Sequence, residues 1–378
     1  MKILFFSPYF YPYTSGVTTY PLKILSHLSK KNKVTALTFL YDKKLSNQVT
    51  HNQITIKRMP FLFKVYKGFI SPQSLIYFLK LVKSTDLLIL NQPNFEGLFL
   101  AIFGRIFRKK IISIFHCQVF LQGNFINKII NSVLNFSMNI QLFLSYKIVV
   151  YTKDYIDSLP NFKLFKNKTL EILPPIKKST EDKNYLKKLL KFKENNIWIG
   201  YGGRISSEKG LEYLIDAIKQ LNNETINIVF AGPYGKDVVG ENVYYTKIVG
   251  ELKEFKIKHL FLGNLTSKQL SAFYKTINML VLPSINQTEA FGMVQAEAMI
   301  NGTPVIASNL PGVRMPIKLT KMGIVTEQKN INQLIEAIKN ILGNKNEFTN
   351  KKLIKNAQLI FDIKKVYKFY ENLIYEKN

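Results

Sequence analysis

The stretch PSINQTEAFGMVQAEAMINGTPVIAS runs from Pro283 to Ser308 and follows a short apolar segment. Its pattern predicts a loop, a helix that starts near Gly292, and a buried strand. Glu289 precedes this helix and Glu297 lies more than one turn inside it, with seven residues between them. A strand, a loop, a helix and a second strand in this order form the repeating unit of a parallel α/β sheet.

The expected helix start suits an anionic ligand that also carries hydroxyl groups. The N–H groups of residues 291–294 have no partner inside the helix, and such groups attract anions. Gly292 would allow a ligand to approach the backbone closely. Carboxylates accept hydrogen bonds from vicinal hydroxyls, which makes Glu289 and Glu297 candidates for binding a sugar or a ribose. The alternative is that Glu289 only favours the helix dipole and that Glu297 lies on a solvated face.

The rest of the chain shows two series of alternating strands and helices. Apolar residues at nearly every position of the expected strands favour a parallel sheet that is covered on both faces. The two series predict an α/β fold with two doubly wound Rossmann-like domains, 1–175 and 176–362, divided within the Pro-Pro segment 172–184. Helices are expected at 18–31 and 210–221. Strands are expected at 2–7, 33–39, 86–90, 110–115 and 147–151, and then at 197–203, 226–232, 258–263, 279–284 and 303–308.

Composition and charge narrow the class of protein. Hydrophobic residues make up 47% of the 378 residues, which is typical of a globular chain. Lys and Arg number 53 and Asp and Glu 25, and no acidic residue occurs from Gly97 to Lys153. This excess favours anionic partners, although a general lysine bias would explain it equally well. The single cysteine, Cys117, excludes an internal disulfide and favours a cytoplasmic location.

No segment has the pattern of a membrane-spanning helix or a signal peptide. The apolar start of the chain is interrupted by Pro8 and Pro12. Segment 129–146 lacks charge, but its polar residues recur at helical spacing, which predicts an amphipathic or packed helix. These polar residues form two stripes, Asn131, Asn135 and Asn139 in one and Ser137, Gln141 and Ser145 in the other.

Ligands of open parallel sheets bind beyond the carboxyl ends of the strands, so the loops that follow strands are the candidate sites. The loop 202–210, GGRISSEKG, contains Arg204 and Lys209, which together would neutralise a diphosphate unless both are solvated surface cations. Gly16 follows the first expected strand and precedes a helix. His116 ends the strand 110–115 and is either a structural histidine or a group that faces the ligand.

These motifs resemble those of the nucleotide-sugar glycosyltransferases with the GT-B fold, in the retaining group called glycosyltransferase family four. The similarity is strongest in GRISSEKGLEYLIDA and LVLPSINQTEAFGMVQAEAMINGTPVIAS. The resemblance implies two Rossmann-like domains that face each other across a cleft. The acceptor would bind to the N-terminal domain and the donor mainly to the C-terminal one. It also implies that the last helix, 363–378, crosses back onto the first domain.

The resemblance also implies roles for individual residues. Arg204 and Lys209 would hold the donor diphosphate, and Glu297 would hold the ribose hydroxyls. Glu289 and the backbone of 291–294 would hold the transferred sugar and the distal phosphate. The implied catalytic residues are His116, Glu289, Arg204 and Lys209. The implied donor-binding residues are Gly16, Gly203, Arg204, Lys209, Leu265, Glu289, Ala290, Phe291, Gly292, Met293, Val294 and Glu297.

The expected reaction moves a hexose from a nucleoside-diphosphate sugar to an acceptor hydroxyl. Retention of the anomeric configuration is implied only by the resemblance. The loops after the strands contain no Asp-x-Asp pair for a divalent ion, so we expect neither a metal nor any other cofactor. Arg204, Lys209 and the helix start would stabilise the leaving phosphate instead.

The acceptor is less well specified by the sequence. Segments 61–83 and 103–110 interleave apolar residues with Lys and Arg, which favours an anionic membrane surface as strongly as it favours ordinary amphipathic helices. We therefore expect a lipid-linked or glycan acceptor and a cytoplasmic protein at the inner face of the cytoplasmic membrane.

Two other classes of protein stay open at this point. A sugar-nucleotide enzyme of the same fold that does not transfer, such as an epimerase, would need further acidic groups beside the two glutamates. A nucleic-acid-binding protein would need a compact basic motif or a platform of stacking aromatic residues. It would also leave the two glutamates unexplained, so we expect no nucleic-acid partner.

Overall fold

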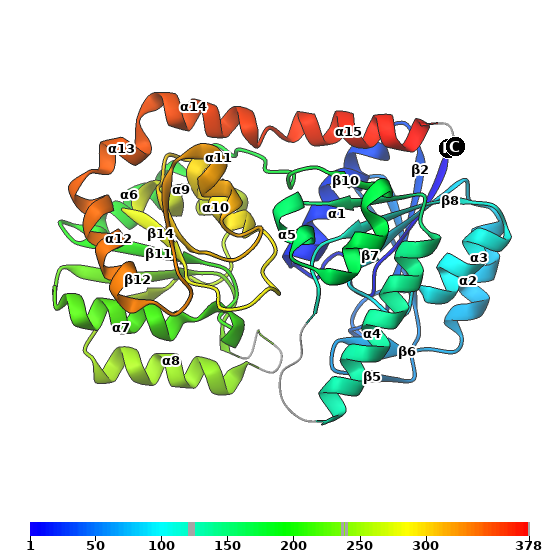
Figure 1. The fold of residues 1–378 in the computed structure, drawn as a ribbon, viewed down its shortest axis with the longest axis horizontal. Coiled ribbons are helices and arrows are strands. Elements are labelled where there is room, and N and C mark those ends of the chain that lie inside the picture. The colour runs from blue at the N-terminus through cyan, green and yellow to red at the C-terminus, as the bar shows by residue number, and fades with distance from the viewer. Residues whose placement is uncertain (120–124, 236–237, 239–240, 377–378) are drawn as a thin grey trace. The chain divides into compact units, whose positions relative to one another are not determined.

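The computed structural model describes residues 1–119, 125–235, 238 and 241–376, and it divides into two compact α/β units (Figure 1). Unit 1 comprises Met1–Pro175 and Ile363–Asn378, and unit 2 comprises Ile176–Asp362. The chain therefore passes between the units within the Pro-Pro segment.

Unit 1 is built on a sheet with the strand order β10-β9-β8-β7-β1-β2-β4-β3. Neighbouring strands are parallel except for β3 and β4, which are antiparallel. The central strands β1 and β7 are almost entirely buried, as expected for a sheet covered on both faces. The antiparallel pair β5 and β6 forms a separate hairpin. The strands are β1 (Lys2–Phe6), β2 (Lys33–Phe39), β3 (Gln48–His51), β4 (Ile54–Met59), β5 (Phe63–Val65), β6 (Gly68–Ile70), β7 (Leu87–Gln92), β8 (Lys110–Phe115), β9 (Lys147–Val150) and β10 (Thr169–Glu171).

The C-terminal helix belongs to unit 1, where it packs against α1 (Figure 1). The hydroxyl groups of Tyr20 and Tyr370 are 2.8 Å apart, and both side chains are buried. The ring of His27 stacks on Tyr367 with 4.0 Å between the centroids. The helices of this unit are α1 (Gly16–Leu28), α2 (Ser74–Lys83), α3 (Leu98–Ile106), α4 (Phe125–Leu144), α5 (Lys153–Asp157), the 3-10 helix η1 (Pro160–Lys168) and α15 (Ile363–Tyr375).

Helix α4 contains most of the uncharged segment 129–146. Within the described residues, no helix combines the length and the apolar character that crossing a bilayer requires.

Unit 2 is built on a parallel sheet with the strand order β13-β12-β11-β14-β15-β16. The first strand of the unit, β11, lies between β12 and β14. The direction in which successive strands are added therefore reverses between β11 and β14. In open α/β sheets, such a reversal marks the place where ligands bind. The strands are β11 (Ile197–Gly202), β12 (Ile226–Ala231), β13 (His259–Phe261), β14 (Met279–Leu282), β15 (Val305–Ser308) and β16 (Gly323–Thr326).

Local sequence explains where several helices of unit 2 begin and which face they bury. The side chains of Asp182, Thr266, Asn330 and Asn350 accept the N–H three residues later, which caps α6, α9, α12 and α14. Helix α7 buries an apolar stripe at helical spacing. The helices are α6 (Lys183–Lys193), the 3-10 helix η2 (Ser207–Lys209), α7 (Leu211–Leu221), α8 (Asn242–Glu254), α9 (Ser267–Thr276), α10 (Met293–Ile300), α11 (Met315–Thr320), α12 (Ile331–Gly343), α13 (Lys345–Thr349) and α14 (Lys351–Ile360).

Unit 1 buries one carboxyl group, that of Glu96, in the loop after β7. Its Oε1 accepts from the N–H of Phe69 at 2.8 Å, and its Oε2 accepts from the N–H of Phe95 at 3.1 Å. Burial raises the pKa of Glu96 from 4.5 to about 7, although these hydrogen bonds act in the opposite direction. The folded protein therefore keeps a proton on Glu96 at pH values where the unfolded chain has lost it.

The stability of the protein is expected to depend on pH through Glu96. Because its pKa is higher in the folded state, this group contributes most at low pH, and its contribution is lost as the pH rises toward 7. The free energy of unfolding, measured with denaturant for the natural protein and for Glu96→Gln, should shift by about 2–3 kcal/mol in favour of the variant between about pH 5 and about pH 8. Parallel pH profiles for the two proteins would contradict the assignment.

Candidate functional site

The loops after β11 and β14 meet where the strand order of unit 2 reverses. The N–H of Ile285 donates to the carbonyl of Glu208 at 3.0 Å. Lys209 Nζ donates to Glu289 Oε2 in an ion pair that links the two loops. The structure thus brings together two of the segments that the sequence analysis singled out, although 80 positions separate the two residues of this pair.

Glycine allows the first of these loops to turn sharply. Gly203 has φ +131° and Gly210 has φ +61°, values that side-chain-bearing residues rarely adopt. A Cβ atom at Gly210 would lie 2.6 Å from the carbonyl oxygen of Pro283. Between the two glycines, the short helix η2 places Lys209 against the loop after β14.

Both cations of this loop are paired with carboxylates. Arg204 Nη2 lies 3.3 Å from Glu208 Oε1, and Lys209 is paired with Glu289. The side chains of Lys209 and Glu289 are only 13% and 18% exposed, so water screens their charges weakly. Burial raises the pKa of Glu208, but Lys209, Ser206 and Arg204 together lower it below its usual range. The four side chains therefore form a cluster with two positive and two negative charges.

Glu208 was not among the predicted site residues, and it changes how the site is understood. The sequence analysis counted Arg204 and Lys209 as a net positive pair. Glu208 follows Arg204 by four positions, and this spacing is the signal that could have revealed the compensating carboxylate.

Helix α10 begins next to this cluster, as predicted, but the hydrogen bonding at its N-terminal end differs from the expectation. Gly292 adopts the left-handed conformation with φ +72°, and its N–H donates to Glu289 Oε1 at 2.9 Å. The expectation that this N–H is free is therefore wrong for this structure, because Glu289 caps it. Of the adjoining predicted residues, Ala290 and Phe291 are buried, and Met293 and Val294 are half-buried.

Glu297 lies inside α10 and is half-buried. Tyr274 of α9 donates its hydroxyl to Glu297 Oε2 at 3.0 Å. Burial, and then the charge of Glu297, raise the pKa of Tyr274 well above its usual range. The sequence analysis missed Tyr274, because 23 positions separate it from Glu297 and no local pattern links the two.

The remaining predicted residues lie elsewhere. Leu265 is half-buried in the loop between β13 and α9. Gly16 is the exposed first residue of α1 in unit 1. His116 follows β8 in the same unit. The charged cluster and Glu297 all belong to unit 2.

His116 is buried, and both ring nitrogens are already bonded. Nε2 is 2.6 Å from Asn91 Oδ1, and Nδ1 bonds the hydroxyl of Tyr151. Asn91 directs its amide nitrogen to Ser7 and Val17, so its oxygen accepts and His116 Nε2 carries the proton. Burial lowers the pKa of His116 to about 3, which keeps the ring neutral. A sugar contact by His116 stays a prediction, and it requires the ring to exchange one of these partners.

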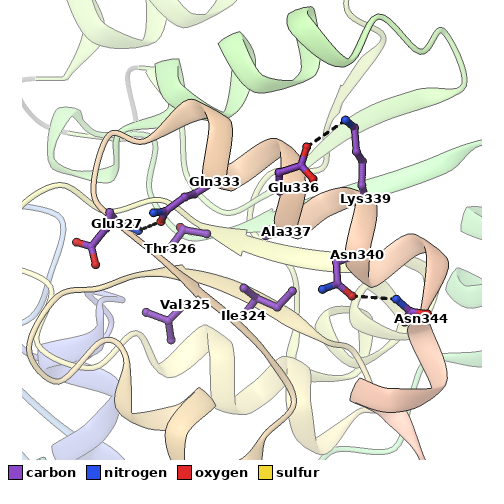
Figure 2. Close-up of a pocket in the computed structure, with 10 residues that line it drawn as sticks. All are labelled: Ile324, Val325, Thr326, Glu327, Gln333, Glu336, Ala337, Lys339, Asn340 and Asn344. Atoms are coloured by element: carbon purple, nitrogen blue, oxygen red, sulfur yellow. Dashed lines mark hydrogen bonds and ion pairs between the residues drawn. The ribbon is translucent and has the colours of Figure 1, made fainter.

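A hollow in unit 2 lies away from this cluster. It has a volume of about 750 Å³ and lies between β16 and α12 (Figure 2). Glu336 and Lys339 on its wall pair with each other at 3.1 Å, as do Asn340 and Asn344 (Figure 2). It shares no residue with the predicted donor set, so we place the functional site at the charged cluster, where the strand order reverses.

The described part of the chain contains no group of three or more His, Cys, Asp or Glu side chains placed to hold a metal ion. Metal independence nevertheless stays a prediction.

Comparison with known proteins identifies the class to which this site belongs. Residues 182–359, just under half of the chain, match the model of the family described as glycosyl transferases group 1. The match contains the clustered residues of both loops and Glu297.

Curated relatives include an uncharacterized glycosyltransferase of Methanocaldococcus jannaschii, which is 30% identical over 167 residues, 43% of this chain and 40% of the relative. Lipopolysaccharide 1,2-N-acetylglucosaminetransferase of Salmonella typhimurium is 33% identical over 131 residues, 34% of each protein. These matches thus span less than half the length of the curated relatives.

Solved structures define the fold over the whole chain. HepE of Anabaena, solved in complex with UDP-glucose, is similar with a TM-score of 0.79 and 18% identity, covering 99% of both chains. Sucrose-phosphate synthase of Thermosynechococcus elongatus is similar with a TM-score of 0.78 and 18% identity, also covering 99% of both. The chain has the GT-B fold, as predicted from the sequence.

Proposed function

We propose that the protein is a retaining glycosyltransferase that moves a hexose from a nucleoside-diphosphate sugar to an acceptor hydroxyl. The observation that carries this proposal is the cluster of Arg204, Lys209 and Glu289 at the start of α10, where the strand order of a group 1 domain reverses. It combines cations for a diphosphate with a carboxylate for sugar hydroxyls. HepE binds UDP and UDP-glucose, which supports a nucleotide-sugar donor for this chain as well.

The proposed chemistry rests on charge that is positioned before the reaction. Negative charge develops on the departing phosphate, and Arg204, Lys209 and the start of α10 would stabilise it. The paired carboxylates hold both cations in place before the donor binds. When the diphosphate binds, Lys209 would turn part of its hydrogen bonding from Glu289 to a phosphate oxygen. Glu289 would then accept from sugar hydroxyls while still capping Gly292.

Unit 2 would thus bind the donor, and unit 1 the acceptor. We propose a lipid-linked or glycan acceptor at the inner face of the cytoplasmic membrane, without a metal cofactor or a nucleic-acid partner. The strong positive charge of unit 1 supports an anionic membrane surface as the place where the protein acts. The name of the Salmonella relative describes transfer to lipopolysaccharide, which supports an acceptor in a surface glycan.

A donor screen tests the proposed function directly. The purified protein is incubated with a panel of nucleoside-diphosphate sugars, with and without a lipid extract, and free nucleoside diphosphate is measured. We expect release with one donor, increased by the extract, and a product that keeps the anomeric configuration of the donor. Release of diphosphate from no donor under either condition would reject the proposal. A product with the opposite anomeric configuration would reject only the retaining mechanism and not the transfer reaction.

Glu297→Ala is expected to weaken binding of the cognate nucleoside diphosphate more than it weakens folding. The loss of hydrogen bonds to a charged acceptor should cost about 1.5–3 kcal/mol of binding free energy. Titration calorimetry measures this, and thermal unfolding checks the fold. The matched control is Tyr274→Phe, which removes the hydroxyl that bonds Glu297 but keeps the carboxylate. It should weaken binding less. Unchanged affinity in Glu297→Ala would exclude the ribose role.

A further inference from the structure

Helix α4 in unit 1 has an apolar outer face. The helix has 20 residues and is therefore roughly 30 Å long. Most of its exposed apolar side chains follow one another at intervals of three, four or seven residues, so they form one stripe along the helix. Phe136 and Phe143 are 66% and 72% exposed, although residues of this kind are usually buried. The exposed members of the stripe are Phe125, Ile126, Ile129, Val133, Phe136 and Phe143.

The inner face of α4 combines buried apolar side chains, Met138 and Leu142, with polar side chains that bond the loop after β7. Ser137 donates its hydroxyl to the carbonyl of Phe95 at 2.8 Å, and Gln141 donates its amide to the carbonyl of Asn94 at 2.9 Å. Ser145 lies 2.8 Å from the hydroxyl of Ser113 on β8. Rotating the helix to bury its apolar stripe would break these buried hydrogen bonds. The fold of unit 1 therefore holds the apolar stripe outward.

The β5–β6 hairpin extends this apolar surface. The hydroxyl of Tyr66 at its turn donates to Asn127 Oδ1 at 2.7 Å, so the turn lies beside the start of α4 (Figure 1). Leu62, Phe63 and Tyr66 of this segment are all more than half exposed. We call the outer face of α4 together with residues 62–67 the α4–hairpin surface.

The stretch of chain that contains this surface is strongly basic. Between Lys43 and Lys153 the chain has 15 lysine and arginine residues and only two acidic ones. One of the two, Glu96, is buried. Lys64, Lys67 and Lys128 lie within the α4–hairpin surface itself. A second copy of this chain would bring like charges together, whereas an anionic lipid surface complements both the charge and the apolar stripe.

We propose that the α4–hairpin surface docks into the interface of an anionic bilayer. The apolar stripe would enter the boundary between headgroups and acyl chains, with the lysines at the level of the headgroups. This deepens the membrane association proposed above, because it assigns attachment to a defined apolar face in addition to charge. It does not rest on the transfer reaction, since attachment requires no donor.

Vesicle cosedimentation tests this proposal with the full chain. The vesicles contain either neutral phosphatidylcholine alone or about 30 mol% anionic phosphatidylglycerol. We expect the natural protein to prefer the anionic vesicles. The triple variant Ile129→Ser, Val133→Ser, Phe136→Ser should bind them at least about 10-fold more weakly, because it removes apolar area from the stripe. Replacement of the same three residues by leucine keeps the stripe apolar and should bind like the natural protein.

Control variants separate this surface from exposed apolar area in general. Leu190→Ser with Phe192→Ser removes comparable exposed side chains, 49% and 60% exposed, from α6 of unit 2 and should leave vesicle binding unchanged. Thermal unfolding verifies that every variant is folded. Equal vesicle binding by the serine triple variant and the natural protein would overturn the proposal. So would absence of vesicle binding by the natural protein, including the case in which the protein self-associates through α4. Release of nucleoside diphosphate with a soluble acceptor reports on the transfer function separately.

Discussion

Lys209→Ala is expected to lower the rate of sugar transfer by about 10²–10³-fold, which is the usual cost of removing one preorganised stabilising group. Lys209 is only 13% exposed, so its charge acts on a bound phosphate with little screening. The substitution also leaves the Glu289 carboxylate without this partner, and its negative charge would then repel the diphosphate. Both effects act in the same direction.

A double-mutant cycle separates these two effects. Glu289→Gln alone should reduce turnover and leave binding of the nucleoside diphosphate nearly intact. In the double variant Lys209→Ala, Glu289→Gln, part of the binding lost in Lys209→Ala should return, because the repulsion is gone, while turnover stays low. Calorimetry gives the binding and a release assay gives the turnover. Additive effects on binding would show that the ion pair between Lys209 and Glu289 has no bearing on the donor.

The same site leads us to expect that the natural protein stays active in excess EDTA. Positive charge from Arg204, Lys209 and the start of α10 would replace a divalent ion at the phosphates. Added magnesium should not restore Lys209→Ala. Loss of natural activity in EDTA, with recovery in magnesium or manganese, would show that an ion is the electrostatic partner of the diphosphate.

Gly232→Ala is expected to destabilise unit 2 by about 3 kcal/mol or more. Gly232 ends the strand region of β12 with φ +142°, which is close to inaccessible for alanine. A Cβ atom there would lie 2.2 Å from the carbonyl oxygen and 2.7 Å from the carbonyl carbon of Gly203. Both are backbone atoms at the start of the loop that carries Arg204. The loop would have to move, so donor binding should fall together with stability.

The matched control is Gly263→Ala at the end of the neighbouring strand β13. Gly263 also has a positive φ, +67°, but a Cβ atom there would meet nothing within 4 Å. The free energy of unfolding of this variant should fall only by the cost of the backbone conformation, about 1–2 kcal/mol. Chemical denaturation of both variants makes the comparison. Equal losses would show that close approach of the two loops contributes nothing to stability.

Much of the fold followed from patterns within single segments. The expected strands 33–39 and 110–115 coincide with β2 and β8, because continuous apolar runs between polar segments are typical of buried parallel strands. The longest strand that was not predicted is β4, with six residues. The short strands β3, β5, β6, β10 and β16 were not predicted either. Each of these short strands has three or four residues, and strands this short form because a neighbouring strand or hairpin partner is already in place.

The candidate site was predictable where its chemistry is local. The turn at Gly203–Gly210 and the helix start at Gly292 depend on glycine conformations and helix ends, which short motifs encode. The pairing of Lys209 with Glu289 was not predictable. It depends on β11 and β14 lying side by side, and that arrangement is a property of the whole sheet.

The sequence by itself determined the alternation of strands and helices, the helical character of segment 129–146 and the glycines that allow the loops to turn, since each depends on residues close together in the chain. Only the tertiary structure decided which groups meet. It buried His116 between Asn91 and Tyr151, and it turned the face of α4 that carries Ser137 and Gln141 inward. The spacing of residues along a helix specifies which side chains share a face, but not which part of the protein that face packs against. Here buried carbonyl groups of the loop after β7 accept from Ser137 and Gln141, and Met138 and Leu142 are buried on the same face. This face therefore packs inward and the exposed apolar stripe points outward.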